Sequence, residues 1–300
     1  MASSTSSTTN ALPREQSVPC LLQTEHEQLD CPKFFLPNEL IAHCLSFLHH
    51  RDLVKTRLVC WDWRDLSDEE IEKRDPKELF PKLTILDGNV WKMHINMENY
   101  GLEVDDTKPP SKRQIIVVMK ELFAKLKIER NAGITLLAVP KGYSLAIAEE
   151  SARAPLEGNS TGIRFITDEI KAQLGEEKVK KTYYVAITNS VLENSRNISI
   201  EEQEALVKEY MCEIPPYLSL VALNLLTCIT SSAASPIYLY DNSTYSRGKE
   251  AVRFIDTTVK FKYDYFNTIV GDFTTAGLYV FDKFQSYELN KIGVAALRKF

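Results

Sequence analysis

The chain has 300 residues, of which 44% are hydrophobic, and its formal net charge is -5 at pH 7. This composition supplies enough apolar residues for a folded core, and the length predicts two domains. A modestly acidic chain without a long block of like charge gives no electrostatic reason to expect a nucleic acid or an anionic membrane as partner. The six cysteines follow no disulfide-framework or CxxC spacing, so we expect reduced thiols in a cytosolic setting.

The first 31 residues are expected to form a disordered tail. Residues 1–10 (MASSTSSTTN) are too polar and too rich in Ser and Thr to pack into a core. A secretory signal peptide is not expected, because the basic region and the apolar region of such a peptide are both missing.

Residues 36–48 predict a helix with two apolar sides. The apolar residues cover an arc of about 180° on a helical wheel, whereas one buried face needs only about 100°. Pro37 suits the first helical position, and Glu39 meets the positive end of the helix dipole. A second helix, also with two apolar sides, is expected after Asp52. A hairpin of about 35 residues is too short to fold unaided, so the surplus apolar surface predicts a partner, either another part of this chain or another protein.

The motif in this hairpin has about ten positions with a fixed order and spacing. They are LPxEL at 36–40, LxxL at 45–48, DL at 52–53, VC at 59–60 and WRDL at 63–66. This pattern resembles the F-box, the module that docks substrate receptors onto the Skp adaptor of cullin-RING ubiquitin ligases. Three departures, at Cys44, at 49–51 and at Trp61, are expected to weaken adaptor binding without abolishing it.

The resemblance implies one set of residues that face the adaptor or form the core of the module. The set is Leu36, Pro37, Leu40, Ile41, Leu45, Leu48, Leu53, Val59 and Trp63. Trp63 is the expected hot spot, because large aromatic residues dominate the binding energy of most interfaces.

The module is expected to extend over residues 32–104. A charged connector at 67–78 precedes a second helical segment at 83–96, whose largest apolar side chain is Trp91. Trp91 is either part of the last helix of the module or an ordinary core residue of the next domain. The Pro pair within 105–110 cannot continue a helix, so the domain boundary is placed there.

Residues 111–300 are predicted to form one mixed domain. The expected helices are 115–128, 143–154, 168–174, one that starts with the capping-box pair Ser199 and Glu202, and 217–230. The expected strands are 134–139 and 182–188, followed by 237–242, 259–266, 268–273 and 277–282, which favour an antiparallel sheet. Residues 217–230 are too few to span a bilayer, so we expect a buried helix there. The predicted fold class is α+β, with an all-α F-box module followed by a mixed α/β domain.

A second resemblance covers the C-terminal half. Its segments are NAGITLL at 131–137, ITNSVL at 187–192, YSR at 245–247, VGDF at 270–273 and AGL at 276–278. They are similar to segments of F-box proteins encoded by chlamydia-related symbionts of amoebae. This resemblance implies an effector that acts in the cytosol of a eukaryotic host.

Catalytic and metal sites are not expected. All five histidines lie before residue 95, so residues 111–300 cannot hold a Cys-His or Ser-His nucleophile pair unless His94 folds across. No phosphate-binding loop or dinucleotide fingerprint is present. A zinc site could use His43, Cys44, His49, His50 and Cys60, but adjacent pairs are poor geometry for two ligands of one tetrahedral ion. We therefore expect neither a metal nor another cofactor.

The sequence thus predicts a substrate receptor of an SCF-type ubiquitin ligase that catalyses nothing itself. Its expected partners are a Skp-family adaptor, a cullin through that adaptor, and an unidentified target protein, all in the cytoplasm. Two alternatives stay open. The module could recruit the adaptor as a decoy or scaffold without delivering substrates, or it could serve as the address of an enzyme whose site in 111–300 needs no histidine.

Overall fold

The computed structural model describes residues 38–48, 52–53, 67, 69–71, 73–126, 133–165, 168–237, 239–240, 244–256, 262–281 and 290–300. Within these residues it confirms the predicted α+β class, with a helical N-terminal part followed by a domain of helices and two mixed sheets. The expected tail at 1–31 lies outside the described residues.

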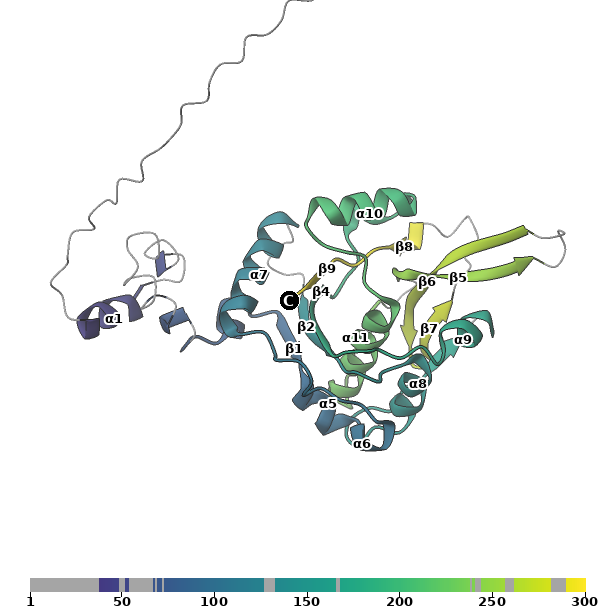
Figure 1. Ribbon diagram of the computed structural model, residues 1–300, viewed down its shortest axis with the longest axis horizontal. Helices are drawn as coiled ribbons and strands as arrows, with labels where there is room; N and C mark the ends of the chain where they lie inside the picture. The colour runs from purple at the N-terminus through teal and green to yellow at the C-terminus, as the bar shows by residue number, and fades with distance from the viewer. Residues whose placement is uncertain are drawn as a thin grey trace, which may run out of the picture.

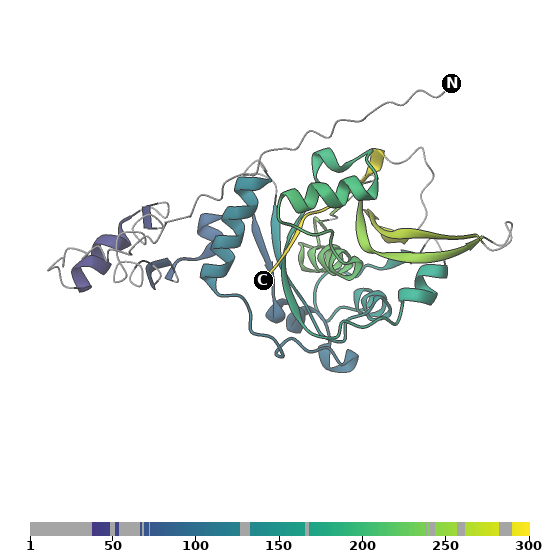
Figure 2. The same cartoon turned by 45° about the horizontal axis from the view of Figure 1, so that its top comes forward.

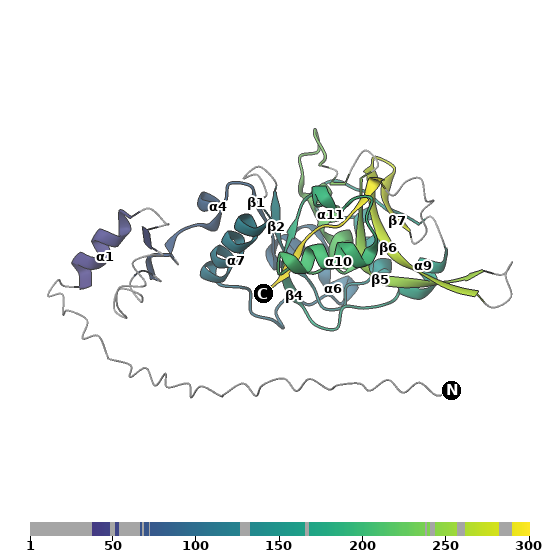
Figure 3. The same ribbon diagram turned by 90° about the horizontal axis from the view of Figure 1, so that it is seen from above.

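Where the structure describes the N-terminal part, two helices can be given with their full bounds, and they lie to one side of the sheets. They are α1 (Asn38–Ser46) and α4 (Pro76–Leu79). Helix α1 lies farthest out, and α4 lies between it and the sheets (Figure 3). Asp75 begins α4, because its carboxylate accepts a hydrogen bond from the backbone N–H of Lys77 at 2.9 Å and Pro76 occupies the first helical position.

The first sheet has the strand order β1-β2-β4-β9. Its strands are β1 (Leu83–Leu86), β2 (Ile134–Val139), β4 (Tyr183–Thr188) and β9 (Leu297–Lys299). β1 runs parallel to β2, while β2 pairs with β4 and β4 with β9 in antiparallel register. Every residue of β2 is buried, because helices cover both faces of this sheet. The continuous apolar run of 134–139 is typical of a strand in that position.

The second sheet has the strand order β3-β7-β6-β5-β8. Its strands are β3 (Ile163–Phe165), β5 (Tyr245–Asp256), β6 (Lys262–Thr274), β7 (Gly277–Phe281) and β8 (Ile292–Gly293). The long strands β5 and β6 pair in antiparallel register, and their far ends project from the body of the domain (Figure 1). β6 and β7 form the second antiparallel pair, which confirms the expected antiparallel arrangement of 268–273 and 277–282.

Helix α11 (Tyr217–Thr230) joins the two sheets into one domain. It lies between them, as Figure 2 shows for the green helix seen nearly end-on. Twelve of its 14 residues are buried, so the predicted buried helix at 217–230 is confirmed. A helix with apolar residues all round needs cover on every side, and the two sheets with α8 supply it.

The remaining helices cover the sheets. They are α5 (Gly88–His94), α6 (Met97–Tyr100), α7 (Lys112–Lys125), α8 (Leu145–Arg153), α9 (Asp168–Leu174), α10 (Ile200–Glu209) and a 3-10 turn at Glu193–Ser195. α7 and α10 pack on the face of the first sheet that points away from α11. Ser199 and Glu202 form the predicted capping box of α10, and Ser111 with Gln114 forms another at α7. Among the described residues, none of the helices combines the length and the apolar character that crossing a bilayer requires.

Two expected elements differ in the structure. The segment 83–96 is a strand followed by a helix, because Leu83–Leu86 pairs with β2. Residues 237–242 were expected to form a strand, but residues 239 and 240 form a turn in which Tyr240 has a φ of 53°. That left-handed backbone conformation cannot continue a strand.

Residues 83–104, which the sequence pattern grouped with the F-box module, pack with the mixed domain instead. Trp91 is buried there, and its indole Nε1–H donates to the carbonyl oxygen of Ala138 in β2 at 2.7 Å. The same indole ring meets Tyr143 edge to face, with ring centroids 5.0 Å apart. Trp91 is therefore a core residue of the second domain.

Candidate functional site

Helix α1 buries one side against the rest of the chain. Ile41 and Leu45 form a cluster with Leu53 and Ile71 from the following segments and with Ile116 from α7. Leu45 is only 1% exposed to solvent. The cluster draws on both parts of the chain, so the N-terminal helices are packed onto the mixed domain.

The opposite side of α1 faces solvent and is also apolar. We call it the exposed stripe, and it consists of Leu40, His43, Cys44 and Phe47. Leu40 is 51% exposed and Phe47 is 76% exposed. The residues follow helical spacing, and the imidazole ring of His43 meets the ring of Phe47 edge to face at a centroid distance of 4.9 Å. The two apolar sides predicted for this helix are therefore present, and the described residues cover only one of them.

The C-terminal end of α1 is held by a basic side chain from further along the chain. The Arg74 guanidinium donates from Nη2 to the backbone carbonyl oxygen of Leu48 at 2.8 Å. This satisfies a carbonyl that no longer has a partner within the helix. The bond ties the segment that follows α1 to residue 74.

Comparison with known families decides what this helical part is. Residues 35–75 match the model of the F-box domain family. The chain therefore carries an F-box domain. F-box domains generally bind the Skp adaptor within SCF ubiquitin ligase complexes. No curated protein and no solved structure matches the chain.

The structure separates the predicted binding set of the F-box protein into core and surface. Ile41, Leu45 and Leu53 are buried, Leu48 packs partly buried against them, and Leu40 is exposed. Four members of the predicted set lie outside the described residues: Leu36, Pro37, Val59 and Trp63. Phe47 was missing from that set, although its position seven residues after Leu40 places both on one side of the helix.

The histidine and cysteine cluster of the F-box region is only partly described. His43 and Cys44 lie in the exposed stripe, while His49, His50 and Cys60 fall outside the described residues. Within the residues that the structure describes, no three His, Cys, Asp or Glu side chains are grouped so that they could hold a metal ion.

The titratable groups in the core of the mixed domain bind to other parts of the core. The Tyr217 hydroxyl donates to the carbonyl oxygen of Leu174 at 3.0 Å, and the Tyr183 hydroxyl lies 2.9 Å from Ser219 Oγ. Burial raises the pKa of Tyr183 to about 12. The Glu250 carboxylate accepts from the backbone N–H of Tyr217, which begins α11, at 2.8 Å. These groups are engaged in holding α11 in place.

Proposed function

We propose that this F-box protein is a substrate receptor of an SCF-type ubiquitin ligase. In this proposal the exposed stripe contacts the Skp adaptor, the mixed domain captures a target, and ubiquitin is transferred by the other subunits of the ligase. The chain itself catalyses no step. The observation that carries the proposal is that α1, inside the F-box match, presents Leu40 and Phe47 to solvent while its other side is fully packed.

The exposed stripe has the character of an interface. Fully burying a Leu or Phe side chain contributes roughly 1.5–3 kcal/mol, so two such residues provide a substantial part of a binding energy. The stripe lies on the helix farthest from the mixed domain (Figure 3). An adaptor bound there leaves the surface of the mixed domain free for a target.

We further propose that the protein acts as an effector in the cytosol of a eukaryotic host. This rests on the resemblance of its C-terminal segments to F-box proteins of chlamydia-related symbionts. The structure brings several of these segments together. Residues 245–247 pair with Ile269, Val270 and Gly271, and Thr135 Oγ1 donates to Asn189 Oδ1 at 2.6 Å.

The test is an affinity purification from eukaryotic cells in which the proteasome is blocked. The full chain is compared with the double variant Leu40→Ala, Phe47→Ala. Wild type is expected to bring down adaptor, cullin and ubiquitinated targets, and the double variant is expected to lose adaptor and cullin together. Leu156→Ala is the matched control, because Leu156 is similarly exposed but lies in the mixed domain.

Two outcomes would overturn the proposal. If the double variant retains the adaptor as well as wild type does, the exposed stripe is not the docking surface. If wild type brings down adaptor without cullin, the protein is a decoy or a scaffold and does not deliver substrates.

A further inference from the structure

The C-terminal end of α11 is capped by an asparagine from a distant loop. Asn159 Nδ2 donates to the backbone carbonyl oxygens of Cys228 and Ser231, each at 2.9 Å, and lies 3.2 Å from Ser231 Oγ. The backbone N–H of Asn159 donates to the carbonyl oxygen of Ile229 at 3.1 Å. The last carbonyls of a helix have no partner within the next turn, so this one residue supplies donors for the end of α11.

The loop that carries Asn159 is pressed against the helix. A Cβ atom added to Gly158 would clash with the carbonyl oxygen of Ile229, and the φ of Gly158 is 105°, a conformation that favours glycine. On the other side, the Ser160 hydroxyl donates to the carbonyl oxygen of Arg153 at 2.6 Å. The amide of Asn159 therefore faces the end of α11 at hydrogen-bonding distance, with no room for a larger group between them.

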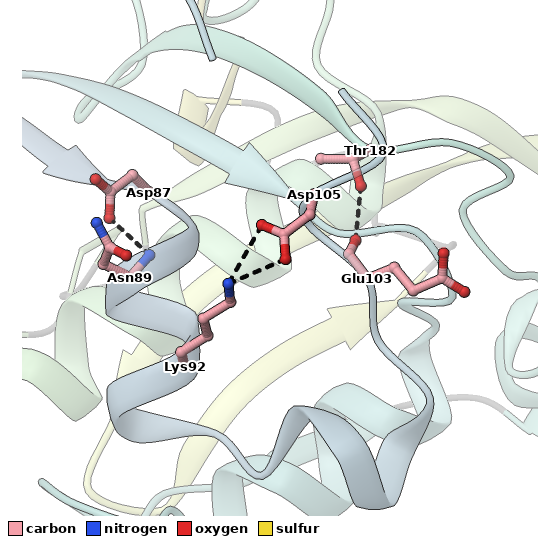
Figure 4. A network of polar contacts seen from close by, with 6 residues as sticks. All are labelled: Asp87, Asn89, Lys92, Glu103, Asp105 and Thr182. Carbon is pink, nitrogen blue, oxygen red and sulfur yellow. Dashed lines mark hydrogen bonds and ion pairs between the residues drawn. The ribbon is translucent and has the colours of Figure 1, made fainter. Parts of the chain in front are cut away.

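Only a hydrogen-bond donor can serve at this end of a helix. Figure 4 shows the opposite case at the start of α5, where the Asp87 carboxylate accepts from the backbone N–H of Asn89 at 3.0 Å. A helix start exposes N–H groups and takes an acceptor, whereas a helix end exposes carbonyls and takes a donor. The amide hydrogens of Asn159 are thus the chemical feature on which the cap of α11 depends.

The same amide belongs to an acceptor triplet for N-glycosylation. Asn159, Ser160 and Thr161 have the pattern Asn-x-Ser/Thr, in which x is not proline. In that reaction the amide nitrogen bonds to the anomeric carbon of an oligosaccharide. The bond from this carbon to a lipid-linked diphosphate breaks, and one amide proton leaves with the diphosphate.

The glycosylated amide cannot make the contacts that cap α11. It has one N–H in place of two, and it carries a sugar carbon about 1.5 Å from the nitrogen. The carbonyl oxygens of Cys228 and Ser231 lie only 2.9 Å from that nitrogen, so the sugar would displace one or both of them.

A second triplet, Asn197-Ile198-Ser199, provides the contrast. Asn197 is exposed in the short connection before α10, so a sugar attached there extends into solvent. A third triplet, at 242–244, lies partly outside the described residues.

We propose that Asn159 is a latent glycosylation site whose modification is incompatible with the folded mixed domain. A chain that enters a compartment with the glycosylating enzyme during synthesis is modified before α11 is capped, and the cap cannot then form. The mixed domain accordingly folds only in a compartment without that enzyme, such as the cytosol. This goes beyond the proposed function, because it concerns where the chain can fold and needs no assumption about adaptor or target.

The experiment expresses the full chain in eukaryotic cells, either in the cytosol or behind an added secretion signal, with the proteasome blocked. All chains carry Asn242→Gln, which removes the third triplet. Peptide mass spectrometry measures sugar occupancy at Asn159, and limited proteolysis of the purified chain measures whether the mixed domain is folded. The secretory form is expected to carry sugar at Asn159 and to be cleaved about tenfold faster than the cytosolic form.

Two variants separate the two described acceptors. Thr161→Val removes the triplet and keeps Asn159, so its secretory form should resist proteolysis as well as its cytosolic form does. Asn197→Gly removes the exposed acceptor and suits the φ of 59° at that position. Its secretory form should be as sensitive as before, because Asn159 is still modified.

The cap itself is tested in the cytosolic chain. Asn159→Asp keeps the size of the side chain but removes its donors, and should lower the melting temperature by roughly 5 °C. Asn197→Asp makes the same chemical change at an exposed position and should leave the melting temperature unchanged.

Three results would overturn the proposal. The first is full sugar occupancy at Asn159 in a secretory chain that resists proteolysis like the cytosolic one. The second is the absence of sugar from Asn159 in the secretory form. The third is equal melting of Asn159→Asp and wild type, which would show that the end of α11 does not need this amide.

Discussion

The ring of Phe80 stacks on the ring of Phe123, with centroids 5.5 Å apart and ring planes inclined by only 3°. Phe80 directly follows α4, and Phe123 belongs to α7. Together with Ile116, this stack joins the helical N-terminal part to the mixed domain through apolar packing. The helical part that carries the exposed stripe therefore shares a packed junction with the mixed domain.

Replacing Ile116 tests this junction. Ile116 is buried, so Ile116→Ala should lower the free energy of unfolding by about 2–5 kcal/mol. Urea unfolding followed by circular dichroism measures the loss. The matched control is Val117→Ala on the same helix, where the side chain is exposed and the loss should stay below about 0.5 kcal/mol. Equal losses in both variants would show that Ile116 does not carry the junction.

Leu40 and Leu45 lie five residues apart on α1 and should respond differently to the same truncation. Leu45→Ala is expected to cost about 2–5 kcal/mol of stability, because it leaves a cavity in the packed cluster. Leu40→Ala should leave the melting temperature nearly unchanged and weaken adaptor binding about tenfold, because it removes most of the apolar side chain that the adaptor would bury. Thermal melting and calorimetric titration with purified adaptor measure the two effects. A Leu40→Ala variant that melts like Leu45→Ala would contradict the assignment.

Cys44 offers a chemical probe of the exposed stripe. It is exposed, whereas Cys212 and Cys228 are buried. Burial raises the pKa of the Cys212 thiol to about 11, so little reactive thiolate forms there near neutral pH. N-ethylmaleimide at pH 7 should therefore modify Cys44 well before the other two, as peptide mass spectrometry can measure.

Bound adaptor should slow the modification of Cys44, and prior modification should block adaptor binding. Cys228 is the internal control, since its rate should not respond to the adaptor. If the adaptor does not protect Cys44, the contact surface must lie elsewhere on the F-box domain.

Glu250 makes stability depend on pH. Burial raises its pKa above the ordinary value of 4.5, and Glu177 raises it further. The folded state then binds the Glu250 proton more tightly than the unfolded chain does. The contribution of Glu250 to stability is fully present below about pH 4.5 and is lost as the pH rises through the folded-state pKa.

Glu250→Gln removes this charge and can still accept the hydrogen bond from the N–H of Tyr217. We expect it to melt at a higher temperature than wild type at pH 7, with a difference that shrinks as the pH falls through the raised folded-state pKa of Glu250 towards 4.5. Differential scanning calorimetry of both proteins between pH 7 and pH 4.5 measures the difference in melting temperature. An advantage that is constant with pH would show that the charge of Glu250 is not the cause.

Elements with local signals could be predicted from the sequence. The capping box at Ser199 and the apolar runs at 134–139 and 217–230 need no distant information. The strand β1 could not be predicted in this way, because Leu83–Leu86 becomes a strand only by pairing with β2. β5 was also missed, since it carries Gly248, Lys249 and Glu250 in its interior and its pairing with β6 is irregular between Arg247 and Ala251.

The candidate docking surface could likewise be predicted only in part from local sequence signals. Helical periodicity revealed two apolar sides on α1, but the side that is buried belongs to a cluster completed by Leu53, Ile71 and Ile116 from later segments. Sequence patterns identify the module, while contacts between distant segments decide which of its surfaces are available.

The position of β9 sets the order in which this protein can fold. β1 begins at Leu83 and β9 at Leu297, yet both belong to the same four-stranded sheet. The sheet therefore stays incomplete during synthesis until residues 297–299 have left the ribosome, and its apolar strands need protection from aggregation during that interval. Deleting the three residues of β9 should consequently be far more damaging to the mixed domain than their number suggests.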